Sequence, residues 1–516
     1  MGGHHTGPLD VMSEQVTGRG ARGIVAAAAP LAAALGAEAL RAGGNAYDGA
    51  VIAALAETVL LAPKCGLGGD LVALRLRPGA PGPEALLASG GAPDGLAAAV
   101  RRHGLHETGP TSVGPPAAPA GYAALAAEAT RPLAELATPA ADLARRGFPW
   151  AAICTWLTER SHDLLVEHQP EGCAYLPGGR AHRPGQIVRL PGLARALDEL
   201  GARGAGVLDG PLGEAVAARV AEAGGVLSPA DLSTARAEWV SAAATEVVGW
   251  RVWATPAPTH GVTLLDTLAG LGAPRDPAPA ATCPAPTTRG AAIDPPATGP
   301  ATDPASIWRS FRAATERRRR ELGDPAPAGT SIVSAADADG NVVMVVHSNS
   351  YPTYGSGLVV PGYDLVLNNR AGRGFSAVEG HPNFPLAGRR PATTLHAWAA
   401  GPSGGRPSHL GGTPGGANQV SWNAQLLAEL VGGERRVGRL VASPRWEWLP
   451  GTDALVIEDG YEAPARARLA GDAPGGWTPC GRWGLRSAQQ VVEVPAAGRP
   501  VVAAADPRTV GAVVGV

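Results

Sequence analysis

The chain has 516 residues, 45% of them hydrophobic, so it can bury a large core and form more than one domain. Its formal charge of −2 leaves no large basic surface, and we expect no nucleic-acid partner. The five cysteines are far apart and form no Cys-x-x-Cys or Cys/His cluster, so we expect no metal site and no disulfide framework.

The sequence offers no membrane segment and no cofactor motif. Arg, Gly and Pro interrupt every apolar run before it reaches the roughly 18 residues of a membrane span. The N-terminus lacks the pattern of a secretory signal peptide, and we expect a cytoplasmic protein. The Gly-rich stretch 65–70 lacks the Gly-Lys-Ser/Thr ending of a phosphate-binding loop, so no cofactor is predicted.

The N-terminal part of the chain is predicted to be largely helical. Apolar residues recur at helical spacing from Leu31 to Leu40, Gly43 and Gly44 end this helix, and a second helix spans residues 46–60. A short strand, residues 71–76, follows the Gly-rich loop, and helical patterns dominate residues 117–223. Cys65 is expected to be a small buried hydrophobic residue, because no histidine neighbour is identifiable.

The composition changes abruptly in the second half. Residues 273–305 are rich in Pro, Ala and Thr without periodicity, which predicts a flexible, exposed segment, and a helix follows over residues 307–322. After Gly329 two apolar runs, residues 332–336 and 342–346, flank an Asp-Gly turn. This pattern predicts a hairpin of two strands buried on both faces.

The register of this hairpin brings hydroxyl groups together. A loop over residues 338–340 would place Thr330 opposite Ser348, whereas a two-residue loop would place it opposite Asn349. Directly opposed residues have Cβ atoms about 4.5–5.5 Å apart, within hydroxyl hydrogen-bond reach. A threonine that begins a strand is usually structural. Here a Pro/Ala segment ending in Gly329 predicts an accessible peptide bond that can be attacked without a Cβ in the way.

Several motifs resemble the γ-glutamyltransferase family of N-terminal-nucleophile (Ntn) hydrolases, from about residue 23 to the end. Their order and spacing carry the resemblance more than any single motif does. The motifs are Ala42-Gly43-Gly44-Asn45-Ala46, Gly66-Leu67-Gly68-Gly69, Gly323-Asp324-Pro325, Gly329-Thr330-Ser331-Ile332-Val333-Ser334, Asp339-Gly340-Asn341, Tyr354-Gly355-Ser356-Gly357, Leu367-Asn368-Asn369, Arg390-Pro391-Ala392-Thr393-Thr394-Leu395, Pro414-Gly415-Gly416 and Ala505-Asp506-Pro507-Arg508.

The resemblance implies an α+β fold, a four-layer αββα sandwich, made as one chain that cuts itself before its nucleophile. The two fragments would be residues 1–329 and 330–516, and they would stay associated. The resemblance leaves open whether such pairs assemble into a higher oligomer. Thr330 would attack the Gly329 carbonyl, and its freed α-amine, with an ordinary pKa of about 7.7–8.0, would then act as its base.

Other site residues follow from the same resemblance. Ser348 would hydrogen-bond the nucleophile, and Gly415 and Gly416 would form the oxyanion hole, although an ordinary tight turn is the alternative for the glycines. The substrate is expected to lie against a further set of residues. This set is Asn349, Ser350, Arg370, Arg373, Thr393 and Thr394.

The chain departs from the family where γ-glutamyl substrates are held. The family's carboxylate-binding arginine is replaced by Ser89, and the positions near its ammonium-binding residues carry Arg370 and Arg373. Two guanidiniums would repel an ammonium and favour a carboxylate, unless both point to solvent. We therefore expect a small anionic substrate that is not a γ-glutamyl compound.

Three functions remain open at this point. The first is an autoprocessing hydrolase of a carboxylate-bearing substrate. Its narrower form resembles the alkylproline branch of lincosamide, hormaomycin and pyrrolobenzodiazepine biosynthesis, which hydrolyses a C–C bond and releases an oxalyl-type fragment; an oxamate-type amidohydrolase is the other form. The second is a true γ-glutamyltransferase or glutathione hydrolase, and the third is a catalytically dead homologue that serves as a binding protein.

Overall fold

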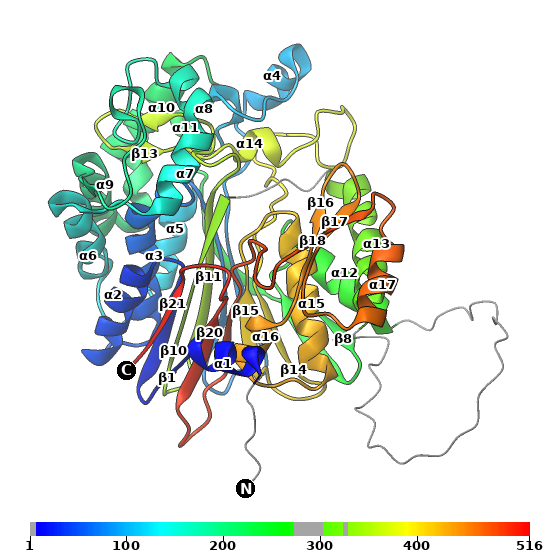
Figure 1. Cartoon of the computed structure of the whole chain (residues 1–516). Coiled ribbons are helices and arrows are strands. Elements are labelled where there is room, and N and C mark those ends of the chain that lie inside the picture. Colours follow the sequence, from blue (N-terminus) through cyan, green and yellow to red (C-terminus); the bar gives the residue numbers. More distant parts are fainter. Residues whose placement is uncertain (1–6, 273–302, 324–328) are drawn as a thin grey trace, which may run out of the picture.

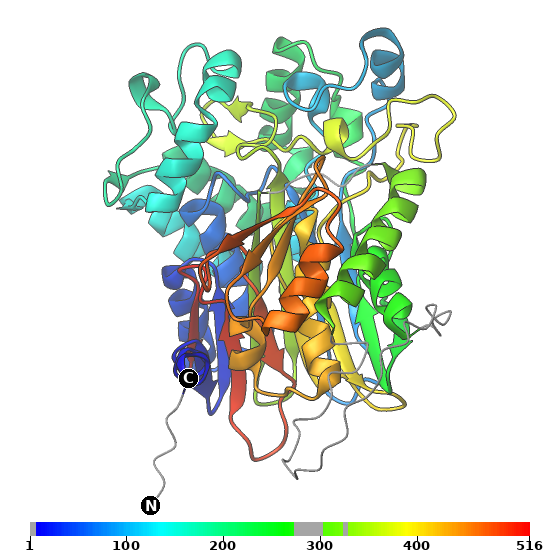
Figure 2. The ribbon, with the colours of Figure 1, turned by 45° about the vertical axis from the view of Figure 1, so that its right-hand side comes forward.

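Two seven-stranded sheets pack face to face at the centre of the molecule, and helices cover both outer faces (Figures 1 and 2). The computed structural model describes residues 7–272, 303–323 and 329–516. The four layers form the mixed α+β sandwich that the family resemblance implies.

One sheet, here the β10 sheet, is built around the predicted hairpin. Both hairpin strands are buried along their whole length, as their apolar runs predict. The strands in spatial order are β21 (Ala512–Gly515), β2 (Gly23–Ala27), β10 (Gly329–Asp337), β11 (Val342–Ser350), β3 (Asp70–Leu76), β4 (Glu84–Ala88) and β7 (Ala237–Ser241). Strands from before and after residue 329 therefore lie side by side in this sheet, since β2 pairs with both β21 and β10, and β11 pairs with β3.

The other sheet, here the β14 sheet, also combines strands from before and after residue 329. Its strands in spatial order are β1 (Thr17–Gly20), β20 (Val501–Ala505), β19 (Gln490–Glu493), β15 (His409–Gly412), β14 (Trp398–Pro402), β9 (Trp250–Ala254) and β8 (Ala243–Val247). Here β1 pairs with β20 and β9 pairs with β14. Side chains such as Ile332 and Met344 from the first sheet, with Leu410 and Val492 from the second, fill the layer between them.

The helices form two outer layers. The β10 sheet is covered by α2 (Pro30–Arg41), α3 (Ala46–Leu60), α5 (Ala118–Ala126), α6 (Leu133–Arg146) and α9 (Pro191–Arg203). The β14 sheet is covered by α12 (Gly261–Gly272), α13 (Pro304–Leu322), α15 (Asn418–Gly432), α16 (Val437–Ala442) and α17 (Ala463–Gly471).

Shorter elements lie at the edges of these layers. The remaining helices are α1 (Pro8–Gln15), α4 (Leu96–His103), α7 (Ala152–Arg160), α8 (His162–His168), α10 (Pro211–Glu222), α11 (Pro229–Leu232) and α14 (Arg370–Arg373). The remaining strands are β5 (Phe148–Pro149) with β6 (Ile187–Val188), β12 (Val359–Val360) with β13 (Leu365–Val366), and β16 (Trp446–Leu449), β17 (Ala454–Glu458) and β18 (Trp477–Cys480).

A capping box joins α3 to the far end of the hairpin. The Asn45 side chain accepts hydrogen bonds from the backbone at Tyr47 and Asp48, while Asp48 Oδ2 accepts the Asn45 N–H at 2.8 Å. Asp337, the last residue of β10, accepts the N–H of Ala46 at 2.9 Å. This contact fixes the helix against the strand that begins at Gly329.

The segment predicted to be flexible, residues 273–305, runs into helix α13. Most of the segment predicted to be flexible, residues 273–302, lies outside the described residues. Its last two residues, Pro304 and Ala305, are helical, because Asp303 accepts the N–H of Ser306 and caps α13 three residues before the predicted start. Within the described ranges no helix is long and apolar enough to cross a membrane.

Candidate active site

Thr330 lies where the hairpin ladder shifts its register. From Ser331, which pairs with His347, to Ala336, the pairing is the one that a three-residue loop predicts. Gly329 instead pairs with Ser350, as a two-residue loop would require, and the irregularity falls at Thr330. Such a bulge re-aims the side chain that it contains.

The bulge directs Thr330 at Ser348, as the resemblance implies. Thr330 Oγ1 lies 3.4 Å from Ser348 Oγ, and the Ser348 hydroxyl donates a short hydrogen bond to the carbonyl oxygen of Gly329. Ser348 Oγ also accepts the N–H of Ser350 at 2.8 Å. Ser350 has a φ of 77°, a costly conformation for a residue other than glycine, so the chain bends sharply directly after this contact. Ser348 therefore connects the Thr330 hydroxyl to the carbonyl that it would attack.

The expectation of an accessible bond before Thr330 is wrong. Gly329 and Thr330 are both buried, because Gly329 is already part of β10. A Cβ at Gly329 would lie 3.1 Å from Thr353 Cγ2 and 3.2 Å from the Ser350 carbonyl, so the tight space around this bond suits glycine.

A surface pocket beside α13, lined by Phe311, Arg312 and Trp448 among others, contains no predicted site residue.

Gly415 and Gly416 form a turn between β15 and α15 that favours glycine at both positions and requires it at Gly415. Their φ values are 141° and 59°, and a Cβ on Gly415 would lie 2.2 Å from the Trp422 ring. The strand before this turn is close to the nucleophile, since a Cβ on Gly412 would lie 2.8 Å from Ile332 Cδ1.

The Gly416 N–H already has a partner in the uncut chain. With its amide in the orientation that satisfies both ends, Gln419 accepts this N–H at 3.1 Å and donates to the Thr394 carbonyl at 2.9 Å. An oxyanion role for Gly415 and Gly416 stays a prediction, and for Gly416 it requires an exchange of this partner.

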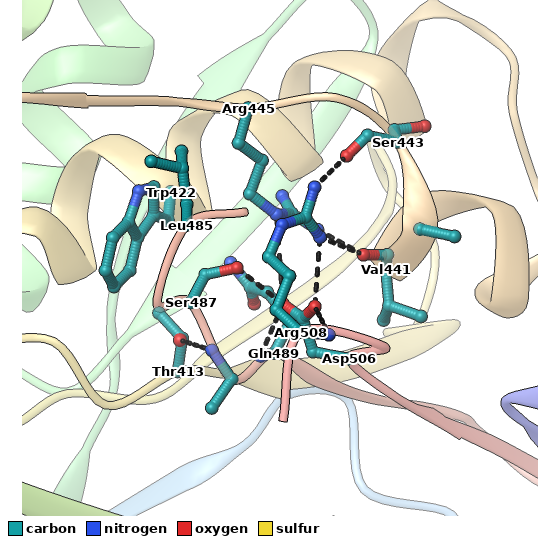
Figure 3. Close-up of polar contacts among 12 residues, drawn as sticks. Thr413, Trp422, Val441, Ser443, Arg445, Leu485, Ser487, Gln489, Asp506 and Arg508 are labelled. Carbon is teal, nitrogen blue, oxygen red and sulfur yellow. Dashed lines mark hydrogen bonds and ion pairs between the residues drawn. The ribbon is translucent and has the colours of Figure 1, made fainter. Parts of the chain in front are cut away.

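A buried ionic network supports the chain next to the glycine turn (Figure 3). Arg508 Nε donates to Glu458 Oε1 at 2.8 Å and Arg508 Nη1 to Asp506 Oδ1 at 2.9 Å. Asp506 Oδ2 in turn accepts the Gln489 N–H at 3.1 Å, and the preceding N–H, that of Ala488, is donated to Thr413 Oγ1 at 3.1 Å. Burial would lower the pKa of Arg508, but Asp506 and Glu458 outweigh it and raise that pKa.

Arg370 points into the protein rather than to solvent. Its Nε donates to Asp70 Oδ2 at 2.8 Å, and both side chains are buried. Asp70 is the register partner of Ser348 in the β11–β3 ladder, so this ion pair lies one strand from the nucleophile. Burial raises the pKa of Asp70, and Arg370 opposes that shift.

Arg373 is also largely buried and paired. Its side chain is 10% exposed, forms an ion pair with Glu107 and lies 5.7 Å from the Tyr351 ring centroid. Burial lowers the pKa of Arg373, and Glu107 and Tyr351 raise it. The alternative that both arginines point to solvent is therefore wrong. The premise of two uncompensated guanidiniums is also wrong, because each has its own carboxylate.

The other predicted substrate residues lie in two places. Asn349 donates to the Ala62 carbonyl at 3.1 Å and faces the Gly-rich loop, where Gly66 lies against its amide. Thr393 forms a bridge with Thr259, and the Thr394 carbonyl is the acceptor for Gln419 described above. Thr393 and Thr394 thus lie beside the glycine turn, whereas Asn349 lies on the side of Asp70.

A buried polar cluster behind the site was missed from the sequence. Glu57 Oε2 lies 3.0 Å from His347 Nε2, and His347 Nδ1 lies 2.7 Å from the Tyr122 hydroxyl. Cys65 lies within reach of Glu57 and His347, which corrects the expectation that it has no histidine neighbour. Glu57 also accepts two backbone N–H groups before α2, so the cluster ties that helix to the residue preceding Ser348. A lone acidic side chain, Glu57, in the apolar run 49–60 is the signal that could have revealed it.

His396, two residues after Thr394, is expected to make stability depend on pH. It is buried as the neutral ring, with Nδ1 donating to the Thr394 carbonyl and Nε2 accepting from Asn423, and burial lowers its pKa to about 4. A lowered histidine pKa contributes stability that is present above about pH 6.5 and is lost as the pH falls toward 4. His396→Gln should therefore lose about 2 kcal/mol less unfolding free energy than the parent chain between pH 7 and pH 5. Urea titrations at both pH values, with Thr330→Ala also present so that the chain stays uncut, measure this difference, and parallel losses would contradict it.

Comparison with known proteins agrees with this architecture. A family model described as gamma-glutamyltranspeptidase matches residues 32–277 and 289–516. The chain is 29% identical over 509 residues to the acylase ACY 1 proenzyme of Pseudomonas sp. (strain SE83), covering 89% of this chain and 88% of that protein. It is 29% identical over 478 residues to the oxamate amidohydrolase proenzyme of Klebsiella pneumoniae, covering 83% and 86%. The cephalosporin acylase from Bacillus halodurans superposes with a TM-score of 0.82 over 97% of each chain at 26% identity.

Proposed function

This chain belongs to the gamma-glutamyltranspeptidase family, and on that premise we propose that it cuts itself before Thr330 and then uses Thr330 to cleave an acyl bond in a carboxylate-bearing substrate that is not a γ-glutamyl compound. Family membership makes it an Ntn-type hydrolase, and the relatives named as proenzymes are consistent with two self-cleaved chains that remain associated. The hydrogen-bond chain from Thr330 through Ser348 to the Gly329 carbonyl is the observation that carries the proposal.

Self-cleavage uses this chain of hydroxyls as a proton relay. Thr330 Oγ1 attacks the Gly329 carbonyl carbon, its proton passes to Ser348 Oγ, and the Ser348 proton passes to the carbonyl oxygen. Collapse of the adduct re-forms the carbonyl and breaks the Gly329–Thr330 C–N bond, and the proton leaving the adduct's hydroxyl goes to the nitrogen. The resulting ester is hydrolysed by water, which frees the Thr330 hydroxyl and leaves residues 1–329 with a new carboxylate.

The mature enzyme gains a base that the precursor lacks. The new α-amine of Thr330, with an ordinary pKa of about 7.7–8.0, takes the proton of its own hydroxyl during attack on substrate. The same acyl-enzyme ester forms whether the bond broken is C–N or C–C, provided that the carbonyl carbon carries a suitable leaving group. Our narrower proposal is C–C hydrolysis that releases an oxalyl-type fragment in alkylproline biosynthesis, and amide hydrolysis like that of the acylase and oxamate relatives is the alternative.

The substrate carboxylate is proposed to bind Arg373. Its partner Glu107 is 69% exposed, so it can turn into solvent at little cost and leave the guanidinium to the substrate. Arg370 is less suited to this role, because its partner Asp70 is buried and fixed. Residue 89 is serine where the family has its carboxylate-binding arginine, and this difference still argues against a γ-glutamyl substrate.

Arg373→Gln is expected to raise KM about tenfold for the 4-nitroanilide of glutaric acid, with little change for that of uncharged butyric acid. Spectrophotometric assay of the processed enzyme measures both. Arg102→Gln, an exposed arginine on α4, is the matched control and should change neither value. Strong turnover of a γ-glutamyl anilide, unaffected by replacing Arg370 and Arg373, would instead support a true γ-glutamyltransferase.

A further inference from the structure

The proposed mechanism gives no role to the buried pair of Asp70 and Arg370. We propose that this pair selects a substrate bearing a hydroxyl group beside its carboxylate. The proposal rests on the proposed function, because the pair lines the same acyl-binding region next to Ser348.

Asp70 and Arg370 lie where a bound acyl group would meet them. Asp70 opposes Ser348 across the β11–β3 ladder, and Ser348 hydrogen-bonds the nucleophile. Ser348 and Asp70 belong to the alternate positions of their strands that face the space between the two sheets, as Val346 and Val72 do. Thr330, Ser348 and Asp70 therefore follow one another across three adjacent strands, and Arg370 of α14 is paired with the last of them.

The ion pair is only half formed. A guanidinium and a carboxylate can join through two parallel hydrogen bonds, but here Nε donates to Oδ2 alone. Among the described residues, Arg370 Nη2 and Asp70 Oδ1 are both buried and have no hydrogen-bond partner. Ser89 and Gly90 are close enough to lower the pKa of Asp70, yet neither completes a hydrogen bond to Oδ1. Ser89 Oγ and Arg373 Nε, on neighbouring residues, are also buried without a partner, and such a group of unsatisfied polar atoms around one ion pair indicates a missing polar group.

The chemistry of that group follows from the charges. The pair has no net charge and is buried, so an added carboxylate would be repelled by Asp70 and an added ammonium by Arg370. A neutral hydroxyl satisfies both atoms at once, because it accepts from Arg370 Nη2 and donates to Asp70 Oδ1. A keto oxygen only accepts and would leave Asp70 unpaired. Arg373, three residues along α14, would hold the adjacent carboxylate.

The test compares four anilides that differ at one carbon. They are the 4-nitroanilide of glutaric acid and its hydroxy, oxo and amino derivatives at the carbon beside the distal carboxylate. We expect wild-type enzyme to cleave the hydroxy compound with roughly 10- to 100-fold higher kcat/KM than the other three. Calorimetric binding of the matching free diacids to processed enzyme should follow the same order.

Asp70→Asn supplies the decisive variant. Its amide oxygen keeps the Arg370 Nε contact and its nitrogen faces the open side, so two donors replace a donor and an acceptor. The preference should then move from the hydroxy to the oxo compound. Asp198→Asn, which alters an exposed ion pair with Arg145, is the matched control and should keep the wild-type order.

Each outcome decides the proposal. Equal rates for the four compounds in wild type, as expected if only water fills the gap, would overturn it, as would an oxo preference in wild type or a hydroxy preference retained in Asp70→Asn. If that variant does not fold, the wild-type order in rate and binding decides alone. Failure of the proposed function is recognised separately, since the chain would then remain a single band on a denaturing gel.

Discussion

Replacement of Thr330 by alanine is expected to leave the chain in one piece and to lower activity by roughly 10⁴-fold or more. Alanine removes both the hydroxyl that attacks Gly329 and the nucleophile of the mature enzyme. On a denaturing gel the parent chain of 51.9 kDa should resolve into bands of about 33 and 19 kDa, whereas the variant should give one band.

Thr330→Ser is the matched control for this experiment. Serine keeps an oxygen at the same place and should cut itself, more slowly if loss of the methyl group loosens the side chain in its buried site. Two bands from the alanine variant after long incubation would show that another residue makes the cut. A single, inactive band from the parent chain would favour the binding homologue.

Arg508→Met is expected to lower the free energy of unfolding by about 3–5 kcal/mol, the cost of breaking a buried ion pair from one side. The side chains of Arg508, Glu458 and Asp506 are fully buried, so the two carboxylates would be left without access to water and with Arg445, 3.9 Å from Asp506, as their remaining cation. Urea unfolding in the Thr330→Ala background measures this on a single uncut polypeptide.

The same variant tests how the network serves the site. Because Asp506 and Thr413 are joined through residues 488 and 489, the loss of Arg508 should also slow self-cleavage by loosening the turn at Gly415. Arg312→Met, which breaks an exposed pair with Asp453, is the control and should cost less than 1 kcal/mol. Equal losses from both variants would contradict the importance given to burial.

Local pattern was sufficient to predict the hairpin, but it left Thr330 opposite either Ser348 or Asn349, and only the family resemblance indicated Ser348. Buried strands read as apolar runs, and an Asp-Gly turn fixes the pairing of the residues on either side of it. The bulge at Thr330 was not predictable, because it arises where the ladder meets the bend at Ser350. Composition also misled at Gly329, since a Pro/Ala-rich segment suggests exposure while the glycine itself already belongs to a buried strand.

The surroundings of the site depended on contacts that no local pattern contains. Asp70 and Arg370 are separated by 300 positions and meet where Asn368, two residues before Arg370, donates to the carbonyl of Gly68, two residues before Asp70, at 2.8 Å. The sequence therefore showed two arginines but not their carboxylates, and the charge argument built on them was incomplete. Asp70 directly follows the Gly-rich loop, and an acidic residue at the entrance of a buried strand was the signal available.

The pairing of strands from before and after residue 329 in both sheets has a consequence for the lifetime of the enzyme. An uncut chain that unfolds can refold as a single molecule, but two separated pieces would have to meet again and thread into each other's sheets, a slow and concentration-dependent event. A cut molecule that unfolds therefore does not readily refold. Its lifetime is set by the rate of unfolding rather than by the equilibrium free energy of unfolding. The fold therefore forms once, in the uncut chain, and is not readily formed again from the separated fragments.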